Sequence, residues 1–226
     1  MSSENSKTFA GIGLVLLLGV AFAWAGSYRG ASFAGIPVFT LGVVMAFSIQ
    51  WIAFVPAMLK RTEKFFDLVG SITYLLVILL SLALVPEADL RSYLLAAMVC
   101  IWAGRLGSFL FTRIHKAGSD QRFDKLKNSF VQFIGAWTLQ GLWVTFTMAA
   151  ALAGITSAKP EPIGALALFG TLIWLTGFLL EAIADHQKSA FKKDPENRDS
   201  FIQSGMWSIS RHPNYLGEII SIWLKF

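Results

Sequence analysis

The strongest constraint on the fold of this 226-residue chain is a series of long apolar runs with almost no charged residues. A helix needs about 20 apolar residues to cross the hydrocarbon core of a bilayer. Only 15% of the residues are charged, whereas a soluble domain carries about a quarter. We therefore predict an all-α fold, a polytopic bundle of transmembrane helices. The expected spans cover residues 8–28, 30–59, 68–86, 92–112 and 162–180, with a further one within 128–158.

A seventh apolar run begins at Pro213 and is shorter than a full span when the sequence stops at Phe226. We therefore expect about seven spans, with the last one truncated. The first run is longer than the roughly 7–15 residues of a signal-peptide core, which favours a retained helix over a cleaved signal. No internal repeat or low-complexity tail is present, and we expect one integral membrane domain over residues 1–226.

Lysine and arginine are distributed unevenly between the loops. The loops after the second, fourth and sixth runs hold thirteen of them, and the opposite loops hold three. Cytoplasmic loops carry this excess, so we predict that the N-terminus and the three basic loops face the cytoplasm. The net charge of +5 is explained by the same bias. We expect the lipid bilayer as the environment, no nucleic-acid partner and no obligate protein partner.

Several common kinds of site are disfavoured by the sequence. Cys100 is the single cysteine, which excludes a disulfide framework. The three histidines, His115, His186 and His212, form no i,i+4 ligand pair, so we expect no metal. The chain contains neither a Gly-x-Gly-x-x-Gly fingerprint nor a Walker loop, which excludes a soluble-type nucleotide-binding fold.

A dense polar cluster lies at the start of the seventh apolar run. Such groups are costly where a chain enters lipid unless they bind something. Pro213 suits a first helical turn, and a helix N-terminus with Arg211 and His212 just ahead of it suits an anion. Gly217 would let a flat ligand or another helix approach the backbone. The cluster consists of Arg211, His212, Pro213, Asn214 and Glu218.

A second polar set lies at the end of the sixth run. Glu181, Asp185, Lys188 and Lys192 follow one another at intervals of three or four residues, so they share one helix face. Acid–base pairs at this spacing stabilise an exposed helix end. Alternatively, the carboxylates accept ribose hydroxyls and the ammonium groups bind phosphates, as in a nucleotide site. The spacing alone leaves both interpretations open.

Isolated polar residues inside the spans form a third group. Arg105 lies about 20 Å into the fourth run at helical rise, where an arginine either snorkels or pairs. Tyr74 could donate a proton to a substrate oxygen, or its hydroxyl could bond a neighbouring helix. Three glutamines also lie inside the spans, and each could join two helices by a hydrogen bond: Gln50, Gln132 and Gln140.

The segment Ser204-Gly205-Met206-Trp207, followed by residues 210–218, resembles the signature of the steroid 5-alpha-reductase-like family. The similarity extends back through Glu181 and Asp185 and, more loosely, through residues 105–107 to residues 65–71. Members of this family are integral membrane enzymes that use NADPH to reduce the carbon–carbon double bond of an enone in a steroid or related lipid. The resemblance therefore implies an NADPH-dependent oxidoreductase with a hydrophobic enone substrate.

The resemblance also implies where the cofactor binds, with a core in residues 181–226. Glu181 occupies a position where the family often has asparagine, and Lys188 and Lys192 match positions of phosphate-binding cations. We add His212, from the same motif, and Arg105 to the expected cofactor-binding set. The family's cofactor contacts correspond to Asp185, Arg211, Asn214, Tyr215, Gly217 and Glu218.

This chain departs from the steroid enzymes at the substrate end. They carry a glutamate and a tyrosine near the substrate ketone, at positions that correspond here to the region of Gln50–Trp51 and to Trp102. We expect Tyr74 and Gln50 as catalytic candidates. The Arg-His-Pro-x-Tyr-x-Gly motif is also shared by membrane methyltransferases that bind S-adenosylmethionine. That activity and a non-enzymatic role in lipid binding or transport are the alternatives.

Overall fold

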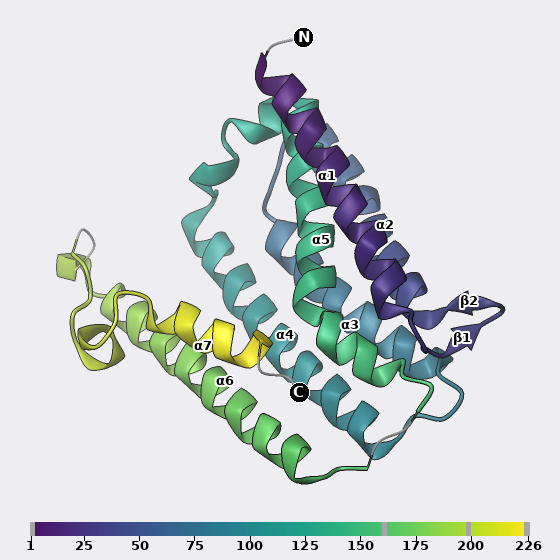
Figure 1. Ribbon diagram of the computed structural model, residues 1–226. Coiled ribbons are helices and arrows are strands. Elements are labelled where there is room, and N and C mark those ends of the chain that lie inside the picture. The colour runs from purple at the N-terminus through teal and green to yellow at the C-terminus, as the bar shows by residue number, and fades with distance from the viewer. Residues whose placement is uncertain (1–2, 160–161, 198–199, 224–226) are drawn as a thin grey trace. The chain divides into compact units, whose positions relative to one another are not determined.

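The computed structural model describes residues 3–159, 162–197 and 200–223, and it is built mainly from helices (Figure 1). Six helices in the described residues are long and apolar enough to cross a membrane, which confirms the predicted polytopic all-α fold. The chain divides into two compact units, Met1–Pro162 and Ile163–Phe226.

The first unit contains five helices of spanning length, a hairpin and two short 3-10 helices. They are α1 (Ser3–Gly26), β1 (Ser32–Phe33), β2 (Ile36–Pro37), α2 (Val38–Leu59), α3 (Phe66–Leu84), α4 (Leu90–Ala117), η1 (Gln121–Phe123), η2 (Leu126–Asn128) and α5 (Phe130–Ile155). The second unit pairs a long helix with a shorter one. It consists of α6 (Ala165–Phe191), η3 (Pro195–Asn197), η4 (Gly205–Ser208) and α7 (Pro213–Trp223).

The helix boundaries differ from the predicted runs most clearly at the start of α2 and at the end of α6. The run that starts at Gly30 first forms the antiparallel hairpin β1–β2, whose turn places Ala34 and Gly35 at positive φ. Helix α2 therefore begins only at Val38, directly after Pro37. Helix α6 continues beyond the apolar residues to Phe191, so the polar set that starts at Glu181 is helical, as its spacing predicts.

Aromatic side chains form the core of the first unit near the N-terminal end of α5. Phe133 and Trp137 of α5 are fully buried and pack with Phe54 of α2 and Phe123 of η1. Phe66, at the start of α3, meets the Trp137 ring edge-on at 5.0 Å between centroids. Edge-to-face pairs of this kind add to the burial of apolar area. This cluster joins α2, α3 and α5 to the loop that carries η1.

A buried carboxylate connects two loops at the same end of the first unit. Glu63, between α2 and α3, is 4% exposed and accepts hydrogen bonds from the Asp120 backbone N–H at 3.0 Å and from Lys127 Nζ at 3.1 Å. Burial raises the pKa of Glu63, but these two donors, the Glu63 backbone N–H and the charge of Lys127 together lower it by more, so the net pKa lies below its ordinary value. The ionised form of Glu63 therefore stabilises this loop pair.

We expect the Glu63→Gln variant to be less stable than the wild type at neutral pH by about 1–3 kcal/mol, because Lys127 loses a charged acceptor. The lowered pKa means that this stabilisation is present above the ordinary glutamate pKa and is lost as pH falls through the folded-state value. The wild-type Tm should therefore fall more steeply than that of Glu63→Gln below about pH 4.3. The control is Glu87→Gln, which removes an exposed carboxylate and should show the same dependence of Tm on pH as the wild type. If the Tm of Glu63→Gln fell with pH as steeply as that of the wild type, the role assigned to Glu63 would be wrong.

Candidate functional site

The predicted cofactor residues of the second unit gather on the pair α6–α7. Two glycines allow the helices to approach closely. A Cβ atom added at Gly217 of α7 would lie 2.5 Å from the backbone nitrogen of Glu181 and 2.6 Å from the carbonyl oxygen of Gly177. An added Cβ at Gly177 would lie 2.6 Å from the backbone nitrogen of Ser221. Gly217 was expected to admit either a flat ligand or another helix, and in the structure it contacts helix α6.

The acidic face of α6 is turned toward α7. Glu181 is 3% exposed and Asp185 is 6% exposed, although both lie near the polar end of a membrane helix. Asn214, in the first turn of α7, donates from Nδ2 to Asp185 Oδ1 at 3.2 Å. The fold thus brings together two predicted site residues that are 29 positions apart in the sequence. Buried carboxylates persist only where donors or cations meet them.

Asn214 also presents an unsatisfied acceptor. Its Oδ1 atom is buried and has no hydrogen-bond partner among the described residues. The amide orientation is assigned from the bond that Nδ2 donates to Asp185. An acceptor left in this state costs about 1–3 kcal/mol, so a ligand that supplies a donor there gains affinity. A ribose hydroxyl or a carboxamide N–H has this chemistry, which fits a pyridine dinucleotide.

The signature segment around η4 is docked on α6 by polar contacts. Trp207 donates from its indole nitrogen to the Ala184 carbonyl at 3.1 Å, and Gln187 accepts from the Met206 backbone N–H at 3.0 Å. The ammonium group of Lys188 lies 5.1 Å from the centre of the Trp207 ring, within cation–π range. Gln187 and Trp207 therefore position the segment that leads into α7.

Lys192 holds the loop beyond α6. Its Nζ donates to the carbonyl oxygens of Asn197 at 3.1 Å and Ser200 at 2.8 Å. These bonds close the chain around η3 and fix where the segment toward η4 begins. A phosphate contact from Lys192 stays a prediction, as does one from Lys188, whose side chain is exposed.

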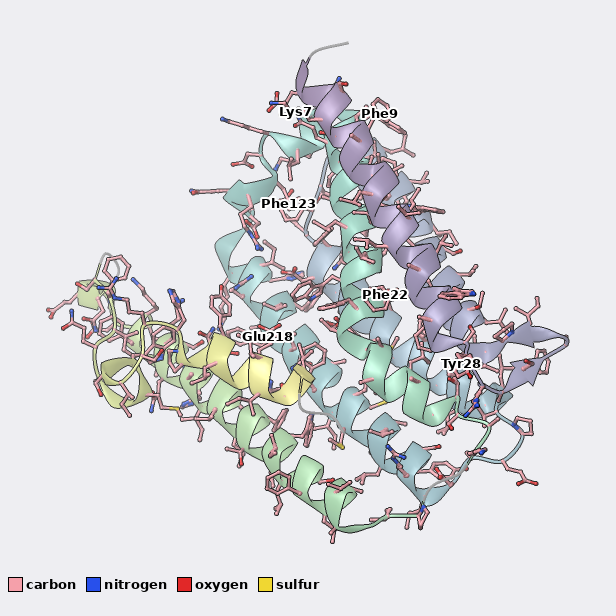
Figure 2. All side chains as sticks on the ribbon, viewed as in Figure 1. Lys7, Phe9, Phe22, Tyr28, Phe123 and Glu218 are labelled. Carbon is pink, nitrogen blue, oxygen red and sulfur yellow. The ribbon has the colours of Figure 1, made fainter. Side chains whose placement is uncertain are left out.

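Three motif residues at the start of α7 have solvent-exposed side chains. Arg211, His212 and Tyr215 are exposed, and the rings of His212 and Tyr215 lie 5.4 Å apart at a tilt of 32°. Glu218 is half-buried on the same helix (Figure 2). An accessible cation, imidazole and phenol at a helix N-terminus suit an anionic ligand. Their cofactor contacts stay predictions.

The two catalytic candidates belong to the first unit, and both are buried and bonded. The Tyr74 hydroxyl lies 2.6 Å from Thr147 Oγ1. Thr147 donates its own proton to the Trp143 carbonyl at 2.8 Å, so Tyr74 is the donor to Thr147. The interhelical bond considered for Tyr74 is therefore present, and a catalytic role for this phenol stays a prediction.

Gln50 is anchored in the same way. Its Nε2 donates to Thr73 Oγ1 at 2.7 Å, and Thr73 donates to the Val69 carbonyl at 2.7 Å. The Oε1 atom of Gln50 is buried without a hydrogen-bond partner among the described residues. The bond to Thr73 uses one of the two N–H groups of Nε2, so Gln50 can still offer its second N–H to a negative oxygen. Its catalytic role also stays a prediction.

Arg105 lies on α4, which is continuous through this position. Its side chain is half-buried. Trp102, one turn earlier, packs edge-on against Tyr74 with the ring centroids 5.1 Å apart. Since Arg105 belongs to the first unit, its expected role in a cofactor site formed by the second stays a prediction.

Sequence reasoning did not single out Thr73, Thr147, Gln187 and Trp207 for the contacts they make. The two threonines orient Gln50 and Tyr74, and the other two residues hold the signature segment. A threonine inside a span bonds its own helix in most cases, and its second contact depends on which helix lies opposite. No local signal in one sequence identifies that partner.

The fold is that of a polytopic membrane protein, and the signature residues gather at α6 and α7. A family model described as "Protein of unknown function (DUF1295)" matches residues 53–226. The chain belongs to this family, which is the steroid 5-alpha-reductase-like family. The resemblance inferred from residues 204–218 is thereby confirmed.

Curated relatives match over a shorter region. The chain is 32% identical over 92 residues to a Delta(14)-sterol reductase of Mus musculus, covering 34% of this chain and 22% of the relative. It is 29% identical over 89 residues to a Delta(14)-sterol reductase of Arabidopsis thaliana, covering 35% and 24%. A Delta(14)-sterol reductase of Ascobolus immersus is 29% identical over 96 residues, covering 36% and 22%. The match thus spans less than a quarter of each relative's length, and no solved structure matches the chain.

Proposed function

We propose that this protein is a membrane reductase that uses NADPH to reduce a carbon–carbon double bond in a sterol or a related polycyclic lipid. The observation that carries the proposal is the buried, unsatisfied Asn214 Oδ1 beside Asp185, within the family's signature region. It is an acceptor that lacks a donor, which a dinucleotide supplies. The names of the relatives support a sterol substrate.

Five residues of the second unit have distinct roles in this proposal. Asn214 Oδ1 accepts a hydrogen bond from the cofactor. The buried carboxylates of Asp185 and Glu181 accept hydrogen bonds from the hydroxyl groups of its ribose. The exposed cations Lys188 and Arg211 bind the phosphates. The bound NADPH supplies the hydride. The excess of basic loop residues supports a cytoplasmic position for this site, where NADPH is available.

Two kinds of double bond make different demands on the protein. Reduction of a 3-oxo-Δ4 enone, our more specific proposal, places a hydride on the β-carbon while negative charge grows on the carbonyl oxygen. A hydrogen-bond donor such as the Tyr74 phenol suits that oxygen. A ring double bond that is not conjugated to a carbonyl group, such as a Δ14 bond, must first accept a proton to form a carbocation. That reaction requires a stronger acid than a phenol.

Purified protein in lipid nanodiscs tests the proposal when it is incubated with NADPH and either a 3-oxo-Δ4 steroid or a Δ14-sterol. We expect oxidation of NADPH together with a product heavier by two hydrogen atoms. NADPH should also raise the Tm, whereas S-adenosylmethionine should not. Stabilisation by S-adenosylmethionine alone would support the methyltransferase. No stabilisation by either cofactor would support a non-enzymatic lipid-binding or transport role.

The Tyr74→Phe variant tests the donor for the enone. If Tyr74 donates to the developing oxyanion, kcat should fall by about 10²–10⁴-fold, while the Kd of NADPH stays within a factor of two or three. The matched control is Thr147→Val, which removes the bond that now holds the Tyr74 hydroxyl but leaves the phenol. Thr147→Val should retain most of the activity. Full turnover by Tyr74→Phe would remove Tyr74 from the catalytic set.

A further inference from the structure

A groove separate from the proposed cofactor site lies in the first unit, between α1 and α5 and beside η1 and η2. Its volume is about 970 Å³, at the upper end of the range for small-molecule sites. Its walls are helix faces that include Thr8, Ile12 and Val15 of α1 and Gln132, Ala136 and Leu139 of α5. Apart from its contacts with α5 and α2, α1 is largely exposed, as expected for a helix in lipid.

Both walls of the groove change from polar to apolar in the same direction. The wall of α1 runs from Glu4 to Val15, and that of α5 runs from Gln132 to Leu139. The two helices are in register, because a Cβ atom added at Gly135 would lie 3.0 Å from the methyl group of Thr8. Figure 1 shows that both helices begin at the same end of the unit. The polar ends of the two walls therefore coincide.

The length of the groove suits a molecule that crosses the membrane boundary. Residues 4 and 15 are separated by about 16 Å along a helix. The polar interfacial layer is roughly 6 Å thick on each side of a bilayer. The groove thus extends from the headgroup layer into the upper hydrocarbon region. Figure 2 labels Lys7 and Phe9 on the part of α1 that borders it.

The polar end carries charges of both signs. Its acidic side chains are Glu4 and Asp124, and its basic ones are Arg122 and Lys125. The ammonium group of Lys125 and the carboxylate of Glu4 make no ion pair with any described residue, whereas Arg122 binds Asp120 and Asp124 binds Lys127. Equal numbers of the two signs match a zwitterion better than an anion.

We propose that this groove binds a zwitterionic phospholipid with a primary ammonium headgroup, that is, a phosphatidylethanolamine. Lys125, beside Arg122, binds the phosphate, and Glu4, beside Asp124, accepts hydrogen bonds from the ammonium group. An acyl chain follows the apolar seam past Ile12 and Leu139. A quaternary ammonium donates no hydrogen bond, so phosphatidylcholine makes fewer contacts here.

Competitive lipid binding tests the proposal. The full-length protein is delipidated in detergent and exposed to mixed vesicles with equal amounts of phosphatidylethanolamine, phosphatidylcholine and phosphatidylglycerol of the same chain length. Native mass spectrometry then counts the bound lipids. We expect phosphatidylethanolamine to be retained at least about tenfold more than the other two, which corresponds to about 1.4 kcal/mol.

Two glycines of α1 provide a matched pair of variants. A Cβ atom at either Gly11 or Gly13 would meet no atom within 4 Å, but only Gly11 lines the groove. Gly11→Leu should therefore fill the groove without strain and abolish the preference, while Gly13→Leu keeps it. The double variant Glu4→Gln, Lys125→Gln should also lose the preference for phosphatidylethanolamine. The control Lys64→Gln, which lies outside the groove, should keep this preference.

Three results would overturn the proposal. Equal retention of all three lipids would indicate a bulk lipid shell. A preference for phosphatidylglycerol would indicate an anionic-lipid site. An unchanged preference in Gly11→Leu would place the bound lipid elsewhere on the protein.

Discussion

Replacing Gly217 by alanine is expected to destabilise the α6–α7 pair strongly. The new Cβ atom would lie 2.5 Å from the Glu181 nitrogen and 2.6 Å from the Gly177 oxygen. Both are backbone atoms, so neither moves away by a change of rotamer. Overpacking of this kind costs about 1–3 kcal/mol, and we expect the upper end. The Tm in detergent and the Kd of NADPH measure the effect.

The matched control is Gly164→Ala, since a Cβ atom at Gly164 would meet nothing within 4 Å. This variant should unfold close to the wild-type temperature. Gly177→Ala, at the same crossing, should resemble Gly217→Ala, because its Cβ would lie 2.6 Å from the Ser221 nitrogen. If Gly217→Ala and Gly164→Ala unfold at the same temperature, the close crossing of α6 and α7 is not a feature of the folded protein.

Removing the Asp185–Asn214 pair is expected to have the largest effect on cofactor binding. Hydrogen bonds to charged groups contribute about 1.5–3 kcal/mol, so Asp185→Ala should raise the Kd of NADPH by about 10–150-fold. Asn214→Ala removes a neutral acceptor and should raise it by about tenfold. Titration of intrinsic tryptophan fluorescence with NADPH measures both values.

The double variant then tests whether the two residues act together. Their side chains are 3.2 Å apart, and residues in contact show coupling of about 0.5–3 kcal/mol. The combined effect on the Kd should therefore differ from the sum of the single effects. Glu196→Ala, an exposed carboxylate of the same unit, serves as the control. If the Asp185 and Asn214 variants bind NADPH like this control, the cofactor does not bind at this pair.

The helix content was readable from the sequence because its signals are local. A run of uncharged apolar residues needs no knowledge of its neighbours to predict a span, and six such helices are present in the described residues. The spacing of Glu181 and Asp185 likewise predicted a shared helix face, which is now seen buried. The hairpin at residues 32–37 was missed because its residues continue an apolar run, and only the positive-φ turn separates them from α2.

The contacts of the candidate site were less predictable. Gly217 could have admitted a ligand or a helix, and the position of α6 decided for the helix. The Tyr74 hydroxyl could have been free to donate to a substrate or bonded to a neighbouring helix. In the structure it is hydrogen-bonded to Thr147 of α5. In each case the partner lies many residues away in the sequence, so no periodic pattern specifies it.

The sequence by itself determined that this protein is a multi-pass helical membrane protein of the steroid 5-alpha-reductase-like family, with a polar signature around residues 204–218. Hydropathy, helical periodicity and a contiguous motif are properties of neighbouring residues. Only the tertiary structure paired Asn214 with Asp185, left Asn214 Oδ1 without a donor and opened the groove between α1 and α5. Those features depend on the distance between separate helices, which side-chain packing sets.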